Sequence, residues 1–123
     1  MKSYGKELIL DLHECDASTF TRKNIRAFFK ALCKRIEMEP ATRYWWDDLY
    51  TPANEKETEP HLVGTSAVQF IKTSNITIHT LDIMRRVYLN VFSCKDFDAD
   101  AAIRVSQIYF RGIVVSSHVI ERR

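Results

Sequence analysis

Three strand-like runs follow one another almost without interruption, and this arrangement constrains the fold more than any other feature of the sequence. The runs cover residues 65–71, 75–80 and 86–93, and apolar and polar side chains alternate along them. The connections between them are only three and five residues long. Such connections suit hairpins, because parallel neighbours need a crossover of about a dozen or more residues. An antiparallel sheet is therefore expected in the middle of the chain.

The flanking segments add helices and further strands to this sheet. Amphipathic helices are expected over residues 21–38 and 98–109, since apolar side chains recur in them at helical spacings. In the second helix, the side chains expected to face the core are Ala101, Ala102, Val105 and Ile108. Further strands are expected over residues 6–15, 41–50 and 113–120.

This order of elements predicts the fold class. Adjacent strands interrupted by isolated helices favour an α+β fold over an alternating α/β fold. The expected architecture is a two-layer sandwich, with a mainly antiparallel sheet and two helices packed on one face. We expect a single domain that covers residues 1–123.

The composition argues against several classes of partner. The 18 basic and 16 acidic residues leave a formal charge of +2, which is too balanced to favour nucleic acid or a membrane surface. No apolar run approaches the roughly 20 residues of a membrane-spanning helix, and the N-terminus lacks the pattern of a signal peptide. The widely spaced Cys15, Cys33 and Cys94 suit neither a disulfide framework nor a zinc site. We expect a cytoplasmic protein without a metal.

Four side chains with nucleophilic or proton-transfer chemistry lie in or beside the central strands: Ser66, Ser74, His79 and Cys94. Each alone is more often structural, as a turn serine, a hydrogen-bonded histidine or a buried thiol. Together they combine hydroxyl, imidazole and thiol, the groups used in proton transfer and acyl chemistry. Hairpin pairing can bring such positions within about 5 Å of one another. No Gly-x-Ser-x-Gly turn, phosphate-binding glycine loop or metal-ligand spacing is present.

These residues also carry a resemblance to a known family. The runs "GKELILDLHECD", "GTSAVQFIKTSNITIHT" and "VYLNVFSCKDFDADAA" resemble those of the small prokaryotic S-adenosylmethionine decarboxylases, which use a pyruvoyl group. The resemblance covers nearly the whole chain. Its most specific element is the order and spacing of Ser66, Ser74, His79 and Cys94.

The resemblance implies self-cleavage between Thr73 and Ser74, which would give chains of residues 1–73 and 74–123. In this family the serine hydroxyl attacks the preceding carbonyl and turns the amide into an ester. Elimination then cleaves the ester and leaves a dehydroalanine, which hydrolyses to a pyruvoyl group at the start of the second chain. The implied cofactor is therefore made from Ser74 itself.

The resemblance also implies a role for each of the four side chains. The hydroxyl of Ser66 and the imidazole of His79 would act as donors during processing, with His79 also as the base. The pyruvoyl group made from Ser74 would form a Schiff base with the amine of a small-molecule substrate. Cys94 would return a proton after CO2 has left.

The sequence departs from the family pattern at two places. The Glu and His that usually flank the cleavage serine are replaced by Thr73 and Asn75. The usual Trp-Pro-Glu is replaced by Leu81, Asp82 and Ile83, although in the family the aromatic holds the adenine and the carboxylate binds the ribose hydroxyls. A buried hydroxyl without a partner costs about 1–3 kcal/mol. In this chain, therefore, either other residues bind the nucleoside or the substrate is not a nucleoside.

Other side chains of this sequence are candidates for binding a nucleoside. Trp45, Trp46 and Tyr50 offer stacking surfaces just before the charged, proline-containing segment 51–61, which is expected to be a long exposed loop. Asp82 is a candidate partner for the ribose, although it would face away from Ile83 on a strand. The candidate substrate-binding residues are Trp46, Leu81, Asp82 and Ile83.

The expected function is S-adenosylmethionine decarboxylation after cleavage before Ser74, which would supply the aminopropyl donor for spermidine synthesis. One alternative keeps the pyruvoyl chemistry but acts on a plain amino acid such as ornithine or arginine. Another is an uncleaved, non-catalytic relative that serves as a binding or regulatory subunit, and a generic α+β binding domain is the last. Because members of the family pair, a homodimer of cleaved protomers is expected, with each site near the subunit interface.

Overall fold

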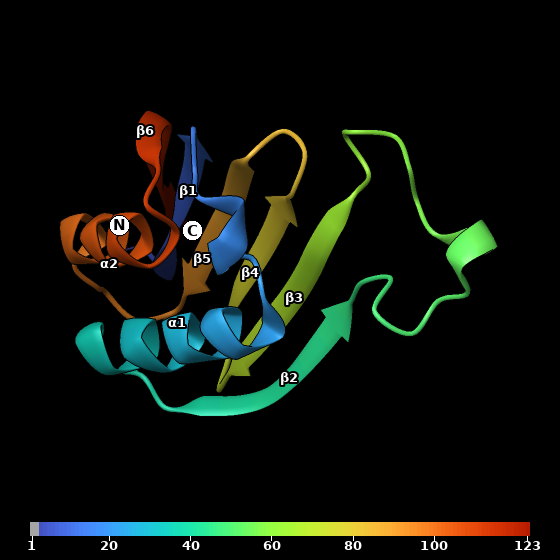
Figure 1. Cartoon of the computed structure of the whole chain (residues 1–123). Coiled ribbons are helices and arrows are strands. Elements are labelled where there is room, and N and C mark those ends of the chain that lie inside the picture. Colours follow the sequence, from blue (N-terminus) through green and yellow to red (C-terminus); the bar gives the residue numbers. More distant parts are fainter. Residues whose placement is uncertain (1–2) are drawn as a thin grey trace.

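The computed structural model of the protein describes residues 3–123. Its centre is a six-stranded sheet with the order β2-β3-β4-β5-β1-β6, in which every neighbouring pair is antiparallel. Two helices cover one face of this sheet (Figure 1). The predicted α+β sandwich is therefore confirmed. The strands are β1 Gly5–His13, β2 Pro40–Trp46, β3 Gly64–Ile71, β4 Ser74–Leu81, β5 Arg86–Ser93 and β6 Ile113–Arg122.

Both helices begin at a polar side chain that caps their first turn. The Thr21 hydroxyl accepts a hydrogen bond from the backbone N–H of Asn24, and α1 follows over Arg22–Arg35. The Asp98 carboxylate caps α2, Ala99–Phe110, in the same way. Helix α1 ends three residues before the predicted boundary, and Glu37 then turns the chain with a positive φ of 60°. Short 3-10 turns occur at Ala17–Thr19 and Ala53–Glu55.

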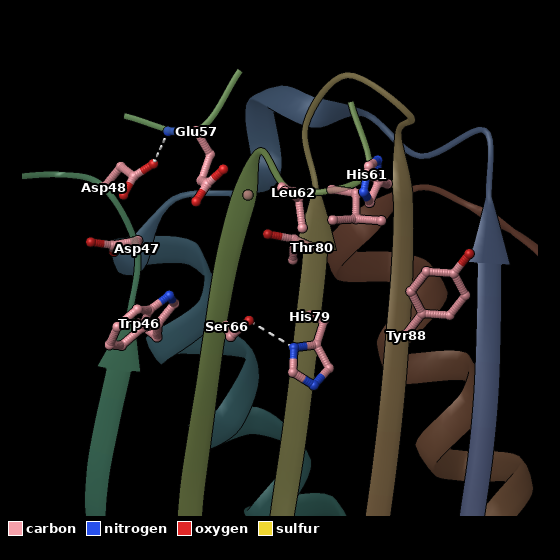
Figure 2. A pocket seen from close by; sticks show the side chains of 12 residues that line it. Trp46, Asp47, Asp48, Glu57, His61, Leu62, Ser66, His79, Thr80 and Tyr88 are labelled. Atoms are coloured by element: carbon pink, nitrogen blue, oxygen red, sulfur yellow. Dashed lines mark hydrogen bonds between the residues drawn. The ribbon is translucent and has the colours of Figure 1, made fainter. Parts of the chain in front are cut away.

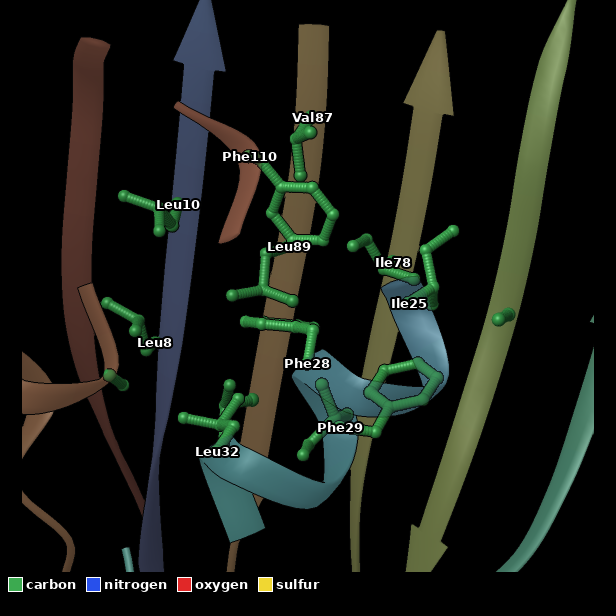
Figure 3. Packing of buried hydrophobic residues seen from close by; sticks show 14 of the residues in the cluster. Leu8, Leu10, Ile25, Phe28, Phe29, Leu32, Ile78, Val87, Leu89 and Phe110 are labelled. Atoms are coloured by element: carbon green, nitrogen blue, oxygen red, sulfur yellow. The ribbon is translucent and has the colours of Figure 1, made fainter. Parts of the chain in front are cut away.

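The core lies between the two helices and the sheet (Figure 3). Phe28 of α1 is fully buried, and its ring centroid lies 4.8 Å from that of Phe110 in α2 and 5.8 Å from that of Phe29. Alternate residues of the strands supply the opposite wall, because side chains two apart share one face of a sheet. The fully buried side chains of β1 and β4 include Leu8, Leu10, Leu12, Ile76 and Ile78.

The rotation of α2 differs from the prediction at one position. Ala101 and Ala102 are buried as expected, whereas Ile108 is 72% exposed. Phe110 packs against Phe28 and Phe20, which turns Ile108 toward solvent. The buried side of the helix also contains Ser106, whose hydroxyl is satisfied by donating to the Ala102 carbonyl.

Strand β2 is shorter than predicted because an ion pair redirects the chain at its end. Asp47 accepts two hydrogen bonds from the guanidinium of Arg22, at 2.7 and 2.9 Å. The strand therefore stops at Trp46, and the following segment extends away from the sheet as a long loop (Figure 1). Residues 52–62 are exposed throughout, as predicted for residues 51–61.

The other face of the sheet has no helix over it (Figure 1); we call it the open face. His79 is exposed on this face, whereas Ile78 and Thr80 on either side of it are buried beneath the helices. The open face also carries three exposed aromatic side chains from its β2–β3 edge, namely Tyr44, Trp46 and Phe70.

Candidate functional site

Ser66 and His79 form a hydrogen-bonded pair on the open face. They are direct cross-strand partners in the β3–β4 hairpin, and the Ser66 Oγ lies 2.7 Å from the His79 Nδ1 (Figure 2). Gly64 helps to bring these strand ends together, because a Cβ at this position would overlap the carbonyl oxygen of Thr80. The predicted hydroxyl and imidazole are therefore in contact, as a proton-transfer pair requires.

A cavity of about 420 Å³ surrounds this pair. Its walls are the ends of the strands and the loop that follows β2 (Figure 2). The indole of Trp46 forms one side, and Leu81 and Tyr88 contribute further surface. The loop adds ionisable side chains, including those of Glu57 and His61. The volume is in the range of small-molecule binding sites, which is about 300–1,000 Å³.

Ser74 and Cys94 form a second group at the other end of β4. Ser74 is only 7% exposed, and its Oγ lies 3.4 Å from the backbone N of Cys94 and 4.0 Å from its Sγ. The hydroxyl of Ser93 is 3.5 Å from that of Ser74. A cavity of about 170 Å³ reaches all three residues. This arrangement brings together the predicted cleavage residue and the predicted proton donor.

The residue before Ser74 has an unusual backbone conformation. Thr73 is the second residue of the two-residue turn between β3 and β4, and its φ is 55°. A positive φ is unfavourable for a β-branched side chain and costs on the order of 1–3 kcal/mol. The peptide bond between Thr73 and Ser74, where cleavage is predicted, therefore lies at a strained position.

The thiol of Cys94 differs in its surroundings from the other two cysteines. Its Sγ is 2.9 Å from the Thr73 Oγ1, and this hydrogen bond is the main reason why the pKa of Cys94 is lowered. Burial instead raises the pKa of Cys15 and of Cys33 to about 11. Cys94 is therefore the cysteine with the greatest thiolate character.

Substitution of Thr73 by valine is expected to raise the pKa of Cys94, because valine has no hydroxyl to stabilise the thiolate. The experiment uses a Ser74→Ala background, which keeps the chain intact, and follows iodoacetamide labelling of Cys94 as a function of pH by peptide mass spectrometry. We expect slower labelling at neutral pH and a higher midpoint in Thr73→Val. Cys15 and Cys33 serve as internal controls that remain unlabelled in the folded protein. An unchanged midpoint would show that Thr73 does not tune the thiol.

The two pairs of candidate residues are far apart within one chain. His79 lies five positions after Ser74 along β4, which corresponds to about 16 Å along a strand. They also face different ways, since Ser74 is buried on the helix side and His79 is exposed on the open face. Hairpin pairing thus joins Ser66 to His79 and Ser74 to Cys94, but it does not bring the four side chains into one site.

The four candidate substrate-binding residues do not all line the same cavity. Trp46 and Leu81 line the 420 Å³ cavity beside His79. Asp82 instead lines a neighbouring cavity of about 410 Å³ with Thr21 at the start of α1, and burial raises the pKa of its carboxyl. Ile83 is exposed in the β4–β5 turn and lies outside the 420 Å³ cavity. Asp82 and Ile83 thus do not line the cavity of Trp46 and Leu81, although Asp47, Asp48, Glu57 and Gly64 line both cavities.

Of the three aromatic residues that offer stacking surfaces, only Trp46 is available to the cavity. Trp45 packs toward the core against Phe29, and Tyr50 lies over the guanidinium of Arg22. The alternation of β2 explains the difference between the two tryptophans, because consecutive side chains point to opposite faces.

Three further residues line these cavities without a signal in the sequence pattern, namely Ser93, Glu57 and His61. The position of Ser93 beside Ser74 follows from the hairpin register, because Asn75 pairs with Phe92 and the next pair therefore joins Ser74 and Ser93. Glu57 and His61 reach the cavity only through the path of the long loop, for which the sequence has no periodic signal.

Within residues 3–123, no three His, Cys, Asp or Glu side chains converge in an arrangement able to hold a metal ion. Neither helix in this part of the chain has the length and apolar character of a membrane span.

Comparison with known proteins identifies the family. The chain is similar to the crystal structure of the adenosylmethionine decarboxylase from Aquifex aeolicus VF5, with a TM-score of 0.77 and 20% identity, over 99% of this chain and 92% of that one. This likeness supports the same fold. No curated protein matched the sequence. The family model described as S-adenosylmethionine decarboxylase matches residues 6–123. Since this match covers nearly the whole chain, the protein belongs to the S-adenosylmethionine decarboxylase family.

Proposed function

We propose that this protein is a pyruvoyl-dependent S-adenosylmethionine decarboxylase of polyamine biosynthesis that cleaves itself between Thr73 and Ser74 and acts as a homodimer. Membership of the family supports a decarboxylase of S-adenosylmethionine type. The observation that carries the finer proposal is the group formed by Thr73, Ser74 and Cys94. It combines a strained peptide bond, an adjacent hydroxyl and a thiol of lowered pKa.

The surroundings of Ser74 fit the formation of a pyruvoyl group. The Ser74 Oγ attacks the Thr73 carbonyl carbon, and the C–N bond breaks as an ester forms and the nitrogen takes up a proton. Loss of the Ser74 α-proton then expels the Thr73 carboxylate and leaves a dehydroalanine. Water replaces its nitrogen, which departs as ammonia. The positive φ of Thr73 favours the first step, because cleavage releases the backbone strain.

The residues beside Ser74 have defined parts in this proposal. The backbone N–H of Cys94 and the Ser93 hydroxyl lie within 3.5 Å of the Ser74 Oγ and orient it. A pyruvoyl group made from Ser74 would supply an electrophilic carbonyl for the substrate amine and an acceptor for the electrons released with CO2. Cys94 lies beside Ser74 and would return a proton to the substrate carbon afterwards, and the hydrogen bond from Thr73 that lowers the pKa of its thiol eases the release of that proton.

The proposed homodimer joins the two separated pairs. A second copy packed on the open face, related by a twofold axis across β4, runs its own β4 in the reverse direction. Its Ser66 and His79 then approach the end of the sheet that carries Ser74 and Cys94. Exposed aromatic side chains on the open face support this contact. Each site would contain residues of both protomers.

The intact mass of the purified chain under denaturing conditions tests the proposed cofactor. We expect two fragments that end at Thr73 and begin at residue 74. The second fragment should be lighter than its sequence by one molecule of ammonia, as conversion of serine to pyruvoyl requires. Ser74→Ala should remain a single chain.

The possible outcomes of this measurement separate the proposed functions. A single wild-type chain of 14.4 kDa after prolonged incubation would contradict the pyruvoyl proposal and favour a non-catalytic relative. Correct fragments without turnover of S-adenosylmethionine, but with turnover of ornithine or arginine, would change the substrate and leave the chemistry in place.

A further inference from the structure

Helix α1 concentrates positive charge that the proposed mechanism does not use. It contains six basic residues and no acidic one. Removing these six charges from the formal net charge of +2 leaves −4 for the rest of the chain. Five acidic residues lie between positions 47 and 59, mostly in the loop that extends away from the sheet (Figure 1). The balanced composition of the whole chain therefore conceals a strong separation of charge.

Four of these basic side chains form a continuous row on the outer side of α1. The row consists of Lys23, Arg26, Lys30 and Lys34, all of which are exposed; we call it the basic stripe. Residues three and four positions apart are neighbours on the surface of a helix, so the four side chains share one face. The row covers about 16 Å of the helix axis, since each residue adds 1.5 Å. The basic stripe is thus an extended line of charge.

The charge of the basic stripe is not neutralised by the described part of the chain. The ion pairs within residues 3–123 involve other cations, namely Lys6, Arg22, Arg111 and Arg122. Like charges three and four positions apart repel one another. Lys23 also lies in the first turn of α1, where the helix dipole disfavours a cation and no acidic residue is present. The basic stripe therefore opposes the stability of α1, and a ligand of high negative charge density would relieve this repulsion.

The residues around the basic stripe favour a nucleic acid duplex over a membrane or a single strand. Helices that lie on a membrane expose large apolar side chains beside their basic ones, whereas Ile25, Phe28 and Leu32 of α1 are fully buried. The exposed apolar side chain beside the stripe is only that of Ala27. Single strands bind through aromatic rings that stack on their bases, and the stripe contains no aromatic residue. A duplex requires only cations for its regularly spaced phosphates.

We propose that the basic stripe of α1 binds the phosphate backbone of a nucleic acid duplex without recognising its bases. A duplex carries about one negative charge per 1.7 Å of its axis, and lysine and arginine side chains bind it by releasing condensed counterions. A row of four cations about 16 Å long faces several phosphates at once. DNA and RNA duplexes share this chemistry, and the experiment below distinguishes them.

The position of the basic stripe leaves the candidate site free. Helix α1 covers one face of the sheet (Figure 1), whereas His79 is exposed on the open face. A duplex on α1 and a second copy of the chain on the open face therefore do not compete. In the proposed homodimer the two stripes would lie on opposite outer surfaces. Duplex binding is thus a property separate from decarboxylation.

The salt dependence of duplex binding tests the inference. Fluorescence anisotropy follows the binding of the full-length wild-type protein to labelled DNA and RNA duplexes at KCl concentrations from about 50 to 200 mM. Four phosphate contacts predict a slope of about −3.6 for the logarithm of the association constant against that of the salt concentration, or a loss on the order of 100-fold in affinity over this range. In Arg26→Gln/Lys30→Gln the slope should become shallower by about two. The duplex that binds more tightly identifies the nucleic acid.

Two matched variants separate the basic stripe from the net charge of the protein. Lys56→Gln/Arg123→Gln removes the same charge at exposed positions outside α1 and should keep the wild-type slope. Arg26→Lys/Lys30→Arg preserves the charge of the stripe and should also keep it. Because all these side chains are exposed, the variants should remain folded, which circular dichroism verifies.

The remaining outcomes would overturn the inference. One is the absence of duplex binding at about 50 mM KCl and about 100 µM protein, since nonspecific complexes form in this range of concentration. Another is an equal slope in Arg26→Gln/Lys30→Gln and its charge-matched control. Stripe-dependent binding that is tighter to phosphatidylserine vesicles or to polyglutamate than to either duplex would assign the surface to a membrane or to an acidic protein instead. None of these measurements depends on self-cleavage or turnover, so they leave the proposed function untouched.

Discussion

Co-expression of Ser74→Ala chains with His79→Ala chains is expected to restore decarboxylase activity that neither variant has alone. In one of the two sites of such a heterodimer, the intact Ser74 of one chain meets the intact His79 of the other. The second site carries both substitutions and remains inactive. Heterodimers purified through two different tags should therefore reach about half of the wild-type activity per dimer, if each site is shared between protomers.

The physical reason is the separation of these residues along β4. About 16 Å of strand lies between Ser74 and His79 within one chain, which is far beyond the reach of a proton transfer. The control pairs Ser74→Ala with Cys94→Ala. Both substitutions lie at the same end of β4, so each site of that heterodimer keeps one defect and should stay inactive. Equal activity in both heterodimers, or none in either, would contradict sites shared across the interface.

Substitution of Phe28 by alanine is expected to lower the free energy of unfolding by about 3–5 kcal/mol. The ring is fully buried and is in contact with Phe29, Tyr109 and Phe110. Its removal leaves a cavity between the two helices and the sheet, and the surrounding side chains collapse into such a space only in part. The loss is large, because domains of this kind have a total stability of about 5–15 kcal/mol.

Chemical denaturation at one fixed protein concentration measures this effect in a Ser74→Ala background, where the chain stays in one piece. Ile108→Ala is the matched control, because Ile108 is an exposed apolar residue on the neighbouring helix. We expect that control to change the stability by less than about 0.5 kcal/mol. A similar small loss in Phe28→Ala would show that the aromatic cluster does not hold the two helices on the sheet.

Much of the candidate site follows from local features of the sequence. The expected hairpin of residues 65–71 and 75–80 is present, but its turn at Lys72 and Thr73 is one residue shorter than expected, and this shorter turn places Ser66 opposite His79 and not opposite Thr80. The register of the next hairpin places Ser74 beside Ser93 and Cys94 in the same way. The sequence also predicts the distance between the Ser66–His79 pair and the Ser74–Cys94 pair, because a strand has a nearly constant rise per residue.

The sequence by itself thus determined the antiparallel hairpins and the two amphipathic helices, since hydrogen bonding and side-chain alternation act over short separations. Only the tertiary structure decided that β1 lies between β5 and β6, that Phe110 turns Ile108 outward, and that Glu57 reaches the cavity beside Trp46. These features depend on contacts between distant segments. Several arrangements agree with the local pattern, and the packing of the whole chain selects one of them.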